Sequence, residues 1–115
     1  MSISVTGKLN QDARQFEAGE ATGFSIRLGA KFYDSKTKET QWTNYEAAFF
    51  LRNEGQVNYH RDTLVKGAIV EVSGSGLRIN QYDGQNGPQI SLAILDPRLG
   101  FTMRPSDQEE ADIPF

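Results

Sequence analysis

Alternating apolar and polar residues in short segments predict a protein built mainly of β-strands. In residues 21–34, Phe24, Ile26 and Leu28 are separated by single residues, so a strand here would turn these three side chains toward a core. The segment YDGQNG at 82–87 contains both Asp-Gly and Asn-Gly, which are strong signals for a hairpin turn. The pattern predicts five strands, over residues 3–9, 21–34, 41–52, 68–79 and 88–95.

One segment fits a helix better than a strand. It is YHRDTLVKG at 59–67, which is short and ends in a glycine typical of a helix C-terminus. The resulting order predicts an all-β fold, a five-stranded Greek-key barrel with a short helix between strands 3 and 4. Gly29, Gly74 and Gly76 lie inside predicted strands and indicate bulges or bends there. We expect residues 98–104, which also alternate, to form an extra short strand or to dock on the barrel.

Length and composition limit the class of protein. At 115 residues the chain fits one domain with its own core, and it has no cysteine for disulfides or thiolate metal sites. No apolar run approaches the roughly 18–20 residues that a membrane helix needs. The first ten residues also lack the apolar core of a signal peptide. We therefore expect a soluble cytoplasmic protein.

The charge is unevenly distributed along the chain, whose formal net charge is -3. Residues 1–104 carry 12 Lys and Arg against 11 Asp and Glu, a net charge of +1, whereas residues 105–115 carry four acids and no base. Local patches, rather than the acidic total, therefore decide which partners bind. We expect residues 1–104 to form the folded domain and residues 105–115 to be a disordered acidic tail.

The sequence shows no catalytic or metal-binding pattern. Its one histidine, His60, has no second histidine, cysteine or close carboxylate pair at a spacing that would bind a metal. There is no phosphate-binding glycine motif and no Gly-x-Ser-x-Gly elbow. The simplest interpretation of His60 is a polar residue on a solvated helix. We expect no enzymatic activity, no cofactor and no metal.

Aromatic residues among basic ones point instead to single-stranded nucleic acid. Proteins hold single strands by stacking bases on aromatic rings in a groove of Lys and Arg. Tyr33 shares a predicted strand face with basic residues, Trp42 begins the next strand among polar ones, and Tyr82 lies beside the hairpin. Each could equally pack on the core, but three in similar settings favour binding. The candidates for phosphate contact are Arg27, Lys31, Lys36, Lys38, Arg52 and Arg78.

Two adjacent aromatic residues, Phe49 and Phe50, end the third predicted strand. Neighbours in a strand face opposite ways, so one of them should be in the core and the other at the surface. Alternation from Trp42 places Phe50 on the side of Trp42, and a bulge would reverse this.

Three stretches resemble bacterial-type single-stranded DNA-binding (SSB) proteins, whose domain is an oligonucleotide/oligosaccharide-binding (OB) fold. They are TQWTNYEAAFF at 40–50, LVKGAIVEVSGSGLRINQYDGQNG at 64–87 and the terminal DIPF at 112–115. The resemblance covers most of residues 1–95 at low identity and the last four residues closely. It implies an OB-fold that binds and protects single-stranded DNA, independently of sequence, in DNA replication, recombination and repair.

The resemblance also implies which aromatic residues stack on DNA. Trp42 matches the family's aromatic at the start of the third strand, and Tyr82 matches the one before the long hairpin. The aromatic that ends the second strand is matched by Phe32 or Tyr33, of which the polar surroundings favour Tyr33. With the adjacent pair in the third strand, the stacking candidates are Trp42, Tyr82, Tyr33, Phe32, Phe50 and Phe49.

The terminal DIPF resembles the family tip that binds replication and repair proteins. There an apolar pocket holds the last Phe and a basic rim receives the acids. The tail's charge would also favour competition with DNA for the basic groove. Family members are homo-oligomers, and we expect a tetramer rather than a dimer. The short tail and weakly basic body indicate a compact variant, such as a phage or plasmid protein of the host cytoplasm. The tip residues are Asp112, Ile113, Pro114 and Phe115.

Another class of function fits the same residues. An OB barrel can act as a protein-interaction adaptor, like a primosome accessory protein, with weak affinity for nucleic acid. In that case replacing the stacking aromatics would leave binding unchanged. An enzyme acting on nucleic acid is the least supported alternative, and an activity screen with divalent metals would detect it.

Overall fold

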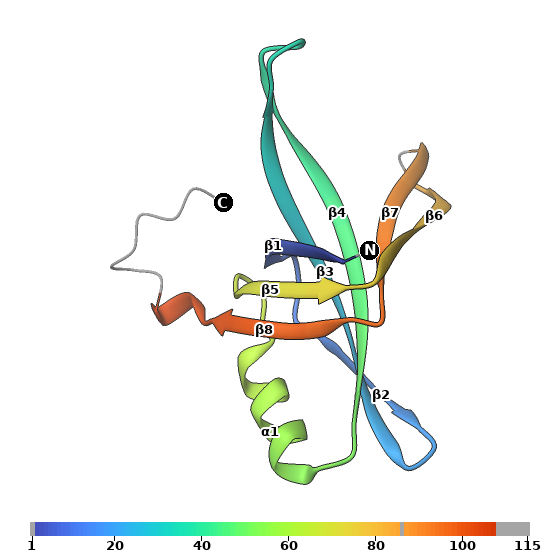
Figure 1. Cartoon of the computed structure of the whole chain (residues 1–115), viewed down its shortest axis with the longest axis vertical. Coiled ribbons are helices and arrows are strands. Elements are labelled where there is room, and N and C mark those ends of the chain that lie inside the picture. The colour runs from blue at the N-terminus through green and yellow to red at the C-terminus, as the bar shows by residue number, and fades with distance from the viewer. Residues whose placement is uncertain (1, 86, 108–115) are drawn as a thin grey trace.

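Strands make up most of the protein, with a short helix at one end and a long hairpin, β3–β4, protruding at the other (Figure 1). The computed structural model describes residues 2–85 and 87–107. Within these ranges the elements are β1 (Ile3–Leu9), β2 (Arg14–Ala18), β3 (Ala21–Asp34), β4 (Glu39–Leu51), α1 (Glu54–Thr63), β5 (Ile69–Gly74), β6 (Gly76–Gly84), β7 (Gly87–Leu95), β8 (Arg98–Met103) and the 3-10 helix η1 (Pro105–Asp107).

The strands form one sheet with the order β6-β7-β4-β3-β1-β5-β8, and β2 pairs with β3. β4 and β7 are parallel, whereas the other pairs are antiparallel. β5 and β6 lie near opposite ends of this order, although only Ser75 separates them in the chain. β5 pairs with β1, whereas β6 pairs with β7. This arrangement confirms the predicted all-β OB-fold with one short helix, although the ladder does not close on itself.

Close backbone packing marks the break between β5 and β6. The Ser75 N–H donates to the Leu95 carbonyl at 2.9 Å, which ties the break to the end of β7. A β-carbon at Gly74 would lie 2.5 Å from that same carbonyl oxygen, so a larger residue would force the strands apart. The predicted interruption of the fourth strand at its glycines is therefore confirmed.

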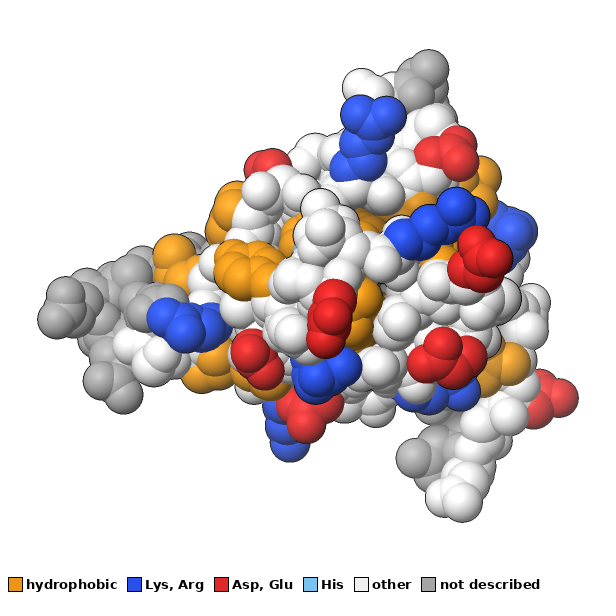
Figure 2. All heavy atoms as spheres, turned by 90° about the horizontal axis from the view of Figure 1, so that it is seen from below, with side chains coloured by type: hydrophobic (Ala, Val, Ile, Leu, Met, Phe, Trp, Pro, Cys, Tyr) orange, Lys and Arg blue, Asp and Glu red, His pale blue; other side chains and the backbone are white. Residues whose placement is uncertain are grey.

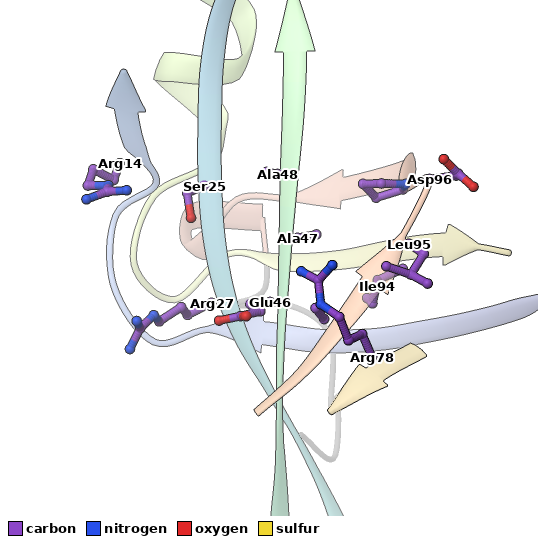
Figure 3. Close-up of a pocket in the computed structure, with 12 residues that line it drawn as sticks. Arg14, Ser25, Arg27, Glu46, Ala47, Ala48, Arg78, Ile94, Leu95 and Asp96 are labelled. Atoms are coloured by element: carbon purple, nitrogen blue, oxygen red, sulfur yellow. The ribbon is translucent and has the colours of Figure 1, made fainter. Parts of the chain in front are cut away.

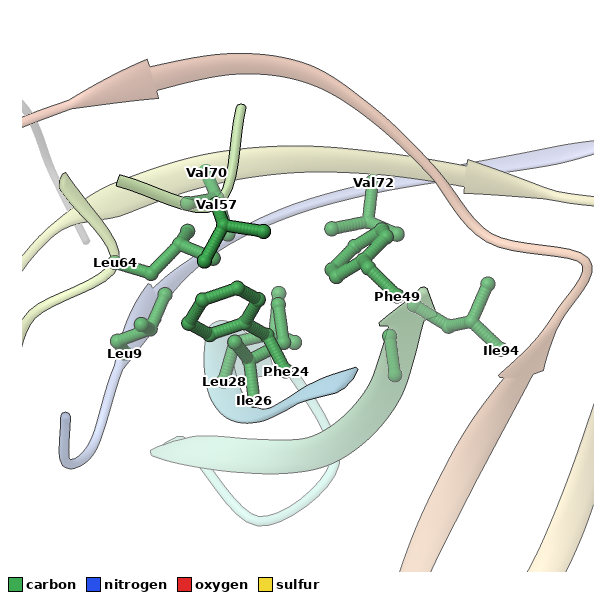
Figure 4. Packing of buried hydrophobic residues seen from close by; sticks show 11 residues of the cluster. Leu9, Phe24, Ile26, Leu28, Phe49, Val57, Leu64, Val70, Val72 and Ile94 are labelled. Atoms are coloured by element: carbon green, nitrogen blue, oxygen red, sulfur yellow. The ribbon is translucent and has the colours of Figure 1, made fainter. Parts of the chain in front are cut away.

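The hydrophobic core lies between the inward faces of the strands and the buried side of α1 (Figure 4). Phe24 and Leu28, on β3, are 1% and 0% exposed. Full burial of a side chain of this size contributes about 1.5–3 kcal/mol. The core therefore holds the barrel end of β3 firmly. Its members are Leu9, Phe24, Ile26, Leu28, Ala47, Phe49, Val57, Leu64, Val70, Val72 and Ile94.

The helix prediction over 59–67 is wrong at both ends, because α1 spans Glu54–Thr63. Asn53 caps its start, since the Asn53 side-chain oxygen accepts from the backbone N–H three residues on at 3.1 Å. The helix ends where Leu64 enters the core, at 1% exposure. Gly67, with φ of 89°, serves the turn into β5 instead of the helix end. No helix within the described ranges is long and apolar enough to cross a membrane.

Two of the strands lie outside the five predicted ones. β2 has too polar a sequence, RQFEA, to show a clear alternation of its own, and it forms by pairing with β3. β8 pairs antiparallel with β5. Of the two predictions for residues 98–104, an extra short strand or docking on the barrel, the extra strand is therefore confirmed. An irregularity between Glu71 and Val72 adjusts the register of that pair.

Candidate nucleic-acid interface

The β3–β4 hairpin presents one continuous outer face, opposite to the core. The two strands pair without interruption from Thr22–Leu51 to Asp34–Glu39. Because side chains alternate along a strand, every second residue of each strand lies on this outer face. Its members are Gly23, Ser25, Arg27, Gly29, Lys31 and Tyr33 on β3, and Thr40, Trp42, Asn44, Glu46, Ala48 and Phe50 on β4.

Trp42 lies on this outer face and is 54% exposed. A β-carbon at Gly29 would come within 3.2 Å of Trp42 Cε3, so the six-membered ring of the indole covers the glycine. The strand pairing is continuous through Gly29, and the bulge considered there is wrong. The glycine makes room for the ring instead. The indole rests on the sheet while more than half of it stays open to solvent.

The structure separates the adjacent phenylalanines of β4 as alternation from Trp42 predicted. Phe50 is 60% exposed on the outer face, whereas Phe49 is 7% exposed and belongs to the core. Its burial makes Phe49 unsuitable as a stacking surface, which corrects its place among the candidates. Phe50 meets Phe16 of β2 edge to face, with ring centroids 5.9 Å apart. Phe16 was missed from the sequence because no strand was predicted over β2. The available signal was the spacing of Arg14 and Phe16, which are two residues apart and would share one face of a strand.

At the outer end of β3, Phe32 and Tyr33 are both exposed, at 49% and 65%. They point to opposite sides of the hairpin. Lys31 is directly opposite Trp42, and Tyr33 shares their face by alternation, whereas Phe32 lies on the other face. The structure therefore places Tyr33, and not Phe32, beside Trp42 on a common surface.

Tyr82 belongs to β6 but reaches across to β3. The Arg27 guanidinium carbon lies 5.7 Å from the centre of the Tyr82 ring, and Arg27 Nη1 donates to the Tyr82 hydroxyl at 3.5 Å. A cation over an aromatic face at this distance is a favourable contact. The pair links the β6–β7 hairpin to the outer face of β3 and leaves Tyr82 37% exposed.

A hollow of about 400 Å³ opens next to this pair, between β3, β4 and β7 (Figure 3). Three arginines line it: Arg14 of β2, Arg27 of β3 and Arg78 of β6. Arg27 and Arg78 were predicted from the sequence, and Arg14 was missed together with β2. Arginine side chains bind phosphate through several N–H groups at once, so three of them around one hollow suit a nucleic-acid backbone. We call this hollow the arginine pocket.

The other basic candidates do not line the arginine pocket. Lys31 lies on the outer face next to Trp42. Lys36 and Lys38 lie in the turn at the tip of the β3–β4 hairpin, where the Lys36 N–H donates to Asp34 Oδ1 at 2.9 Å. Arg52 follows the end of β4. All of them are exposed, so the structure spreads these cations around the aromatic face instead of gathering them.

Basic and acidic side chains are interspersed over the face seen in Figure 2. This agrees with the nearly neutral charge of residues 1–104. Electrostatic attraction of a polyanion must then depend on local groups of cations, of which the arginine pocket is one.

The structure gives His60 a packing role. Its ring stacks on Phe24 with centroids 6.0 Å apart, and Nδ1 lies 2.8 Å from the Gln56 carbonyl. Within the described ranges, no group of three or more histidine, cysteine, aspartate or glutamate residues could hold a metal ion. The predicted tip, Asp112, Ile113, Pro114 and Phe115, lies outside the described residues.

Solved proteins share this fold. The small single-stranded DNA-binding protein from Streptomyces coelicolor matches with a TM-score of 0.56 at 14% identity, over 90% of this chain and 93% of that one. The SSB of Plasmodium falciparum, solved in complex with ssDNA, matches with a TM-score of 0.54 at 16% identity, over 87% of this chain and 94% of that one. No protein-family model and no curated protein sequence matches the chain. The chain therefore has the fold of single-stranded DNA-binding proteins.

Proposed function

We propose that the protein binds single-stranded DNA independently of sequence along the outer face of β3, β4 and β6. The observation that carries this proposal is the arginine pocket with exposed aromatic rings on either side of it along one face. The exposed Phe50 lies toward one end of the β3–β4 hairpin, against the half-buried Phe16, and the exposed Trp42 and Tyr33 lie toward the other end. Tyr82 lies between them, against Arg27.

Each exposed ring can stack one base, which contributes about 1–3 kcal/mol per base. At a rise of about 3.3 Å per residue, the face from Gly23 to Tyr33 runs about 33 Å. That length suits several nucleotides, in line with the roughly 4–16 that one OB-fold covers. Stacking does not distinguish strongly between bases, because every base has an aromatic face. The aromatic rings therefore support binding without sequence preference.

The arginines supply the attraction to phosphate. Arg14, Arg27 and Arg78 come from three different strands and converge on one hollow. When a base of single-stranded DNA stacks on Tyr82, the phosphates next to that base would lie in this hollow, where the guanidinium groups can donate hydrogen bonds to them. Each phosphate that an arginine neutralises releases counterions from the DNA, so we expect the affinity to fall as salt is added.

The same proposal covers the organisation of the chain. Residues 1–104 would form the DNA-binding domain, and residues 105–115 would recruit replication and repair proteins through Asp112, Ile113, Pro114 and Phe115. An acidic run that ends in an aromatic residue supports this, since a partner can attract the charge and enclose the ring. We also propose a homo-oligomer, a tetramer rather than a dimer, acting in the cytoplasm.

Titration with oligo(dT) at low and high salt tests the proposed function directly. Trp42 is the one tryptophan of the chain, so its fluorescence reports on the outer face alone. We expect strong quenching that weakens as salt is added. No quenching and no mobility shift at low salt would refute DNA binding, and would favour the protein-interaction adaptor instead.

A further inference from the structure

Two carboxylates line the arginine pocket, Glu46 and Asp96, although negative charge does not suit a phosphate-binding groove. Asp96 accepts a hydrogen bond from the Ser75 hydroxyl at 2.7 Å. Figure 3 shows Glu46 of β4 between Arg27 and Arg78. A negative charge at this place weakens the attraction of phosphate. Glu46 stands directly opposite Arg27 in the β3–β4 pair, and its carboxylate can also accept a hydrogen bond from a part of the nucleotide that is not the phosphate.

A neighbouring amide holds this carboxylate in place. Asn80 of β6 donates from Nδ2 to Glu46 Oε1, and Asn80 Oδ1 accepts from Arg78 Nε at 3.4 Å. A guanidinium can only donate and a carboxylate can only accept, so these two partners fix which way the amide points. Glu46 Oε2 accepts no hydrogen bond from the part of the chain that the structure describes. It remains available to a ligand.

The pocket therefore offers a hydrogen-bond acceptor, Glu46 Oε2, with arginine donors on either side. Cytosine and adenine present the complementary edge, an exocyclic amino group next to a ring nitrogen that accepts. Thymine and uracil present a carbonyl oxygen where those bases have the amino group, and this oxygen would face the carboxylate. Glutamate is accordingly a residue that accepts from the amino group of cytosine.

We propose that Glu46 gives the protein a preference for cytosine and adenine, cytosine above all, over thymine. Asn80 acts as a positioning residue that holds the carboxylate. The inference rests on the proposed binding of single-stranded DNA, and at one nucleotide it replaces the sequence independence of that binding with a preference between bases. Stacking gives general affinity, and a nucleotide whose base enters the arginine pocket adds selectivity.

The test compares oligo(dC) and oligo(dT) of equal length, at pH 8 so that cytosine stays neutral. The measured quantity is the ratio of the two dissociation constants, for the unchanged protein and for Glu46→Gln. Glu54→Gln, on α1 outside the arginine pocket, removes the same charge elsewhere and is the matched control. Asn80→Ala keeps the carboxylate but removes the group that orients it.

We expect Glu46→Gln to shift the ratio away from oligo(dC) by about fivefold or more, the lower end of what one base contact discriminates. Its affinity for oligo(dT) should stay the same or rise, because a charge that repels phosphate is gone. Asn80→Ala should shift the ratio in the same direction, and Glu54→Gln should leave it unchanged. Binding of both oligonucleotides with a ratio that Glu46→Gln does not alter would overturn this inference alone. Failure of the unchanged protein to bind either one would overturn the proposed function as well.

Discussion

Replacing Trp42 with alanine isolates the contribution of one stacking surface. The indole is 54% exposed and rests on Gly29, so one base can stack on it while the sheet supports it from behind. Loss of one base–aromatic stack costs about 1–3 kcal/mol, which corresponds to a decrease in affinity of about 5- to 150-fold. Because Trp42 lies on the protruding hairpin and not in the core, Trp42→Ala should keep nearly the full free energy of unfolding.

The matched control is Phe32→Ala. Phe32 is 49% exposed on the same hairpin, but it lies on the face opposite to Trp42. Fluorescence anisotropy of labelled oligo(dT) measures both variants, and thermal unfolding followed by circular dichroism confirms that they are folded. We expect the affinity to fall for Trp42→Ala and to stay unchanged for Phe32→Ala. Equal losses in the two variants, or unchanged binding by Trp42→Ala, would refute the assignment of the outer face.

Three further substitutions test the fold and the pocket. Gly74→Ala should lower the free energy of unfolding in urea by about 1–3 kcal/mol or more, because its β-carbon meets a backbone oxygen at 2.5 Å. Gly76→Ala, whose nearest neighbouring atom would be at 3.7 Å, should be close to neutral, and equal effects would contradict the packing at this break. Arg78→Ala should reduce the slope of log affinity against log salt by about 0.7 for each phosphate that the arginine neutralises, whereas Lys66→Ala, outside the arginine pocket, should not. Asn53→Ala should destabilise the protein by about 0.5–2 kcal/mol in the same urea assay, and no loss would show that the helix cap is unimportant.

The strands and their faces could be predicted largely because alternation is a local property. Whether Trp42, Tyr33 or Phe50 faces outward follows from counting residues along one strand, provided that no bulge intervenes. The β3–β4 pairing has no bulge, so the count holds over its whole length. The helix was placed too late because its start depends on a cap by Asn53, a side chain that also suits the end of a strand.

The aromatic face was thus in large part determined by the sequence alone, and so was the acidic character of residues 105–115. The arginine pocket was decided by the tertiary structure. Arg14, Arg27 and Arg78 lie on three different strands, β2, β3 and β6. They come together because β2 pairs with β3, β7 pairs in parallel with β4, and β6 pairs with β7. The contact of Asn80 with Glu46 has the same origin. Local patterns show which way a side chain points, but strand order and register depend on how the whole core packs, so only the folded chain shows which side chains converge.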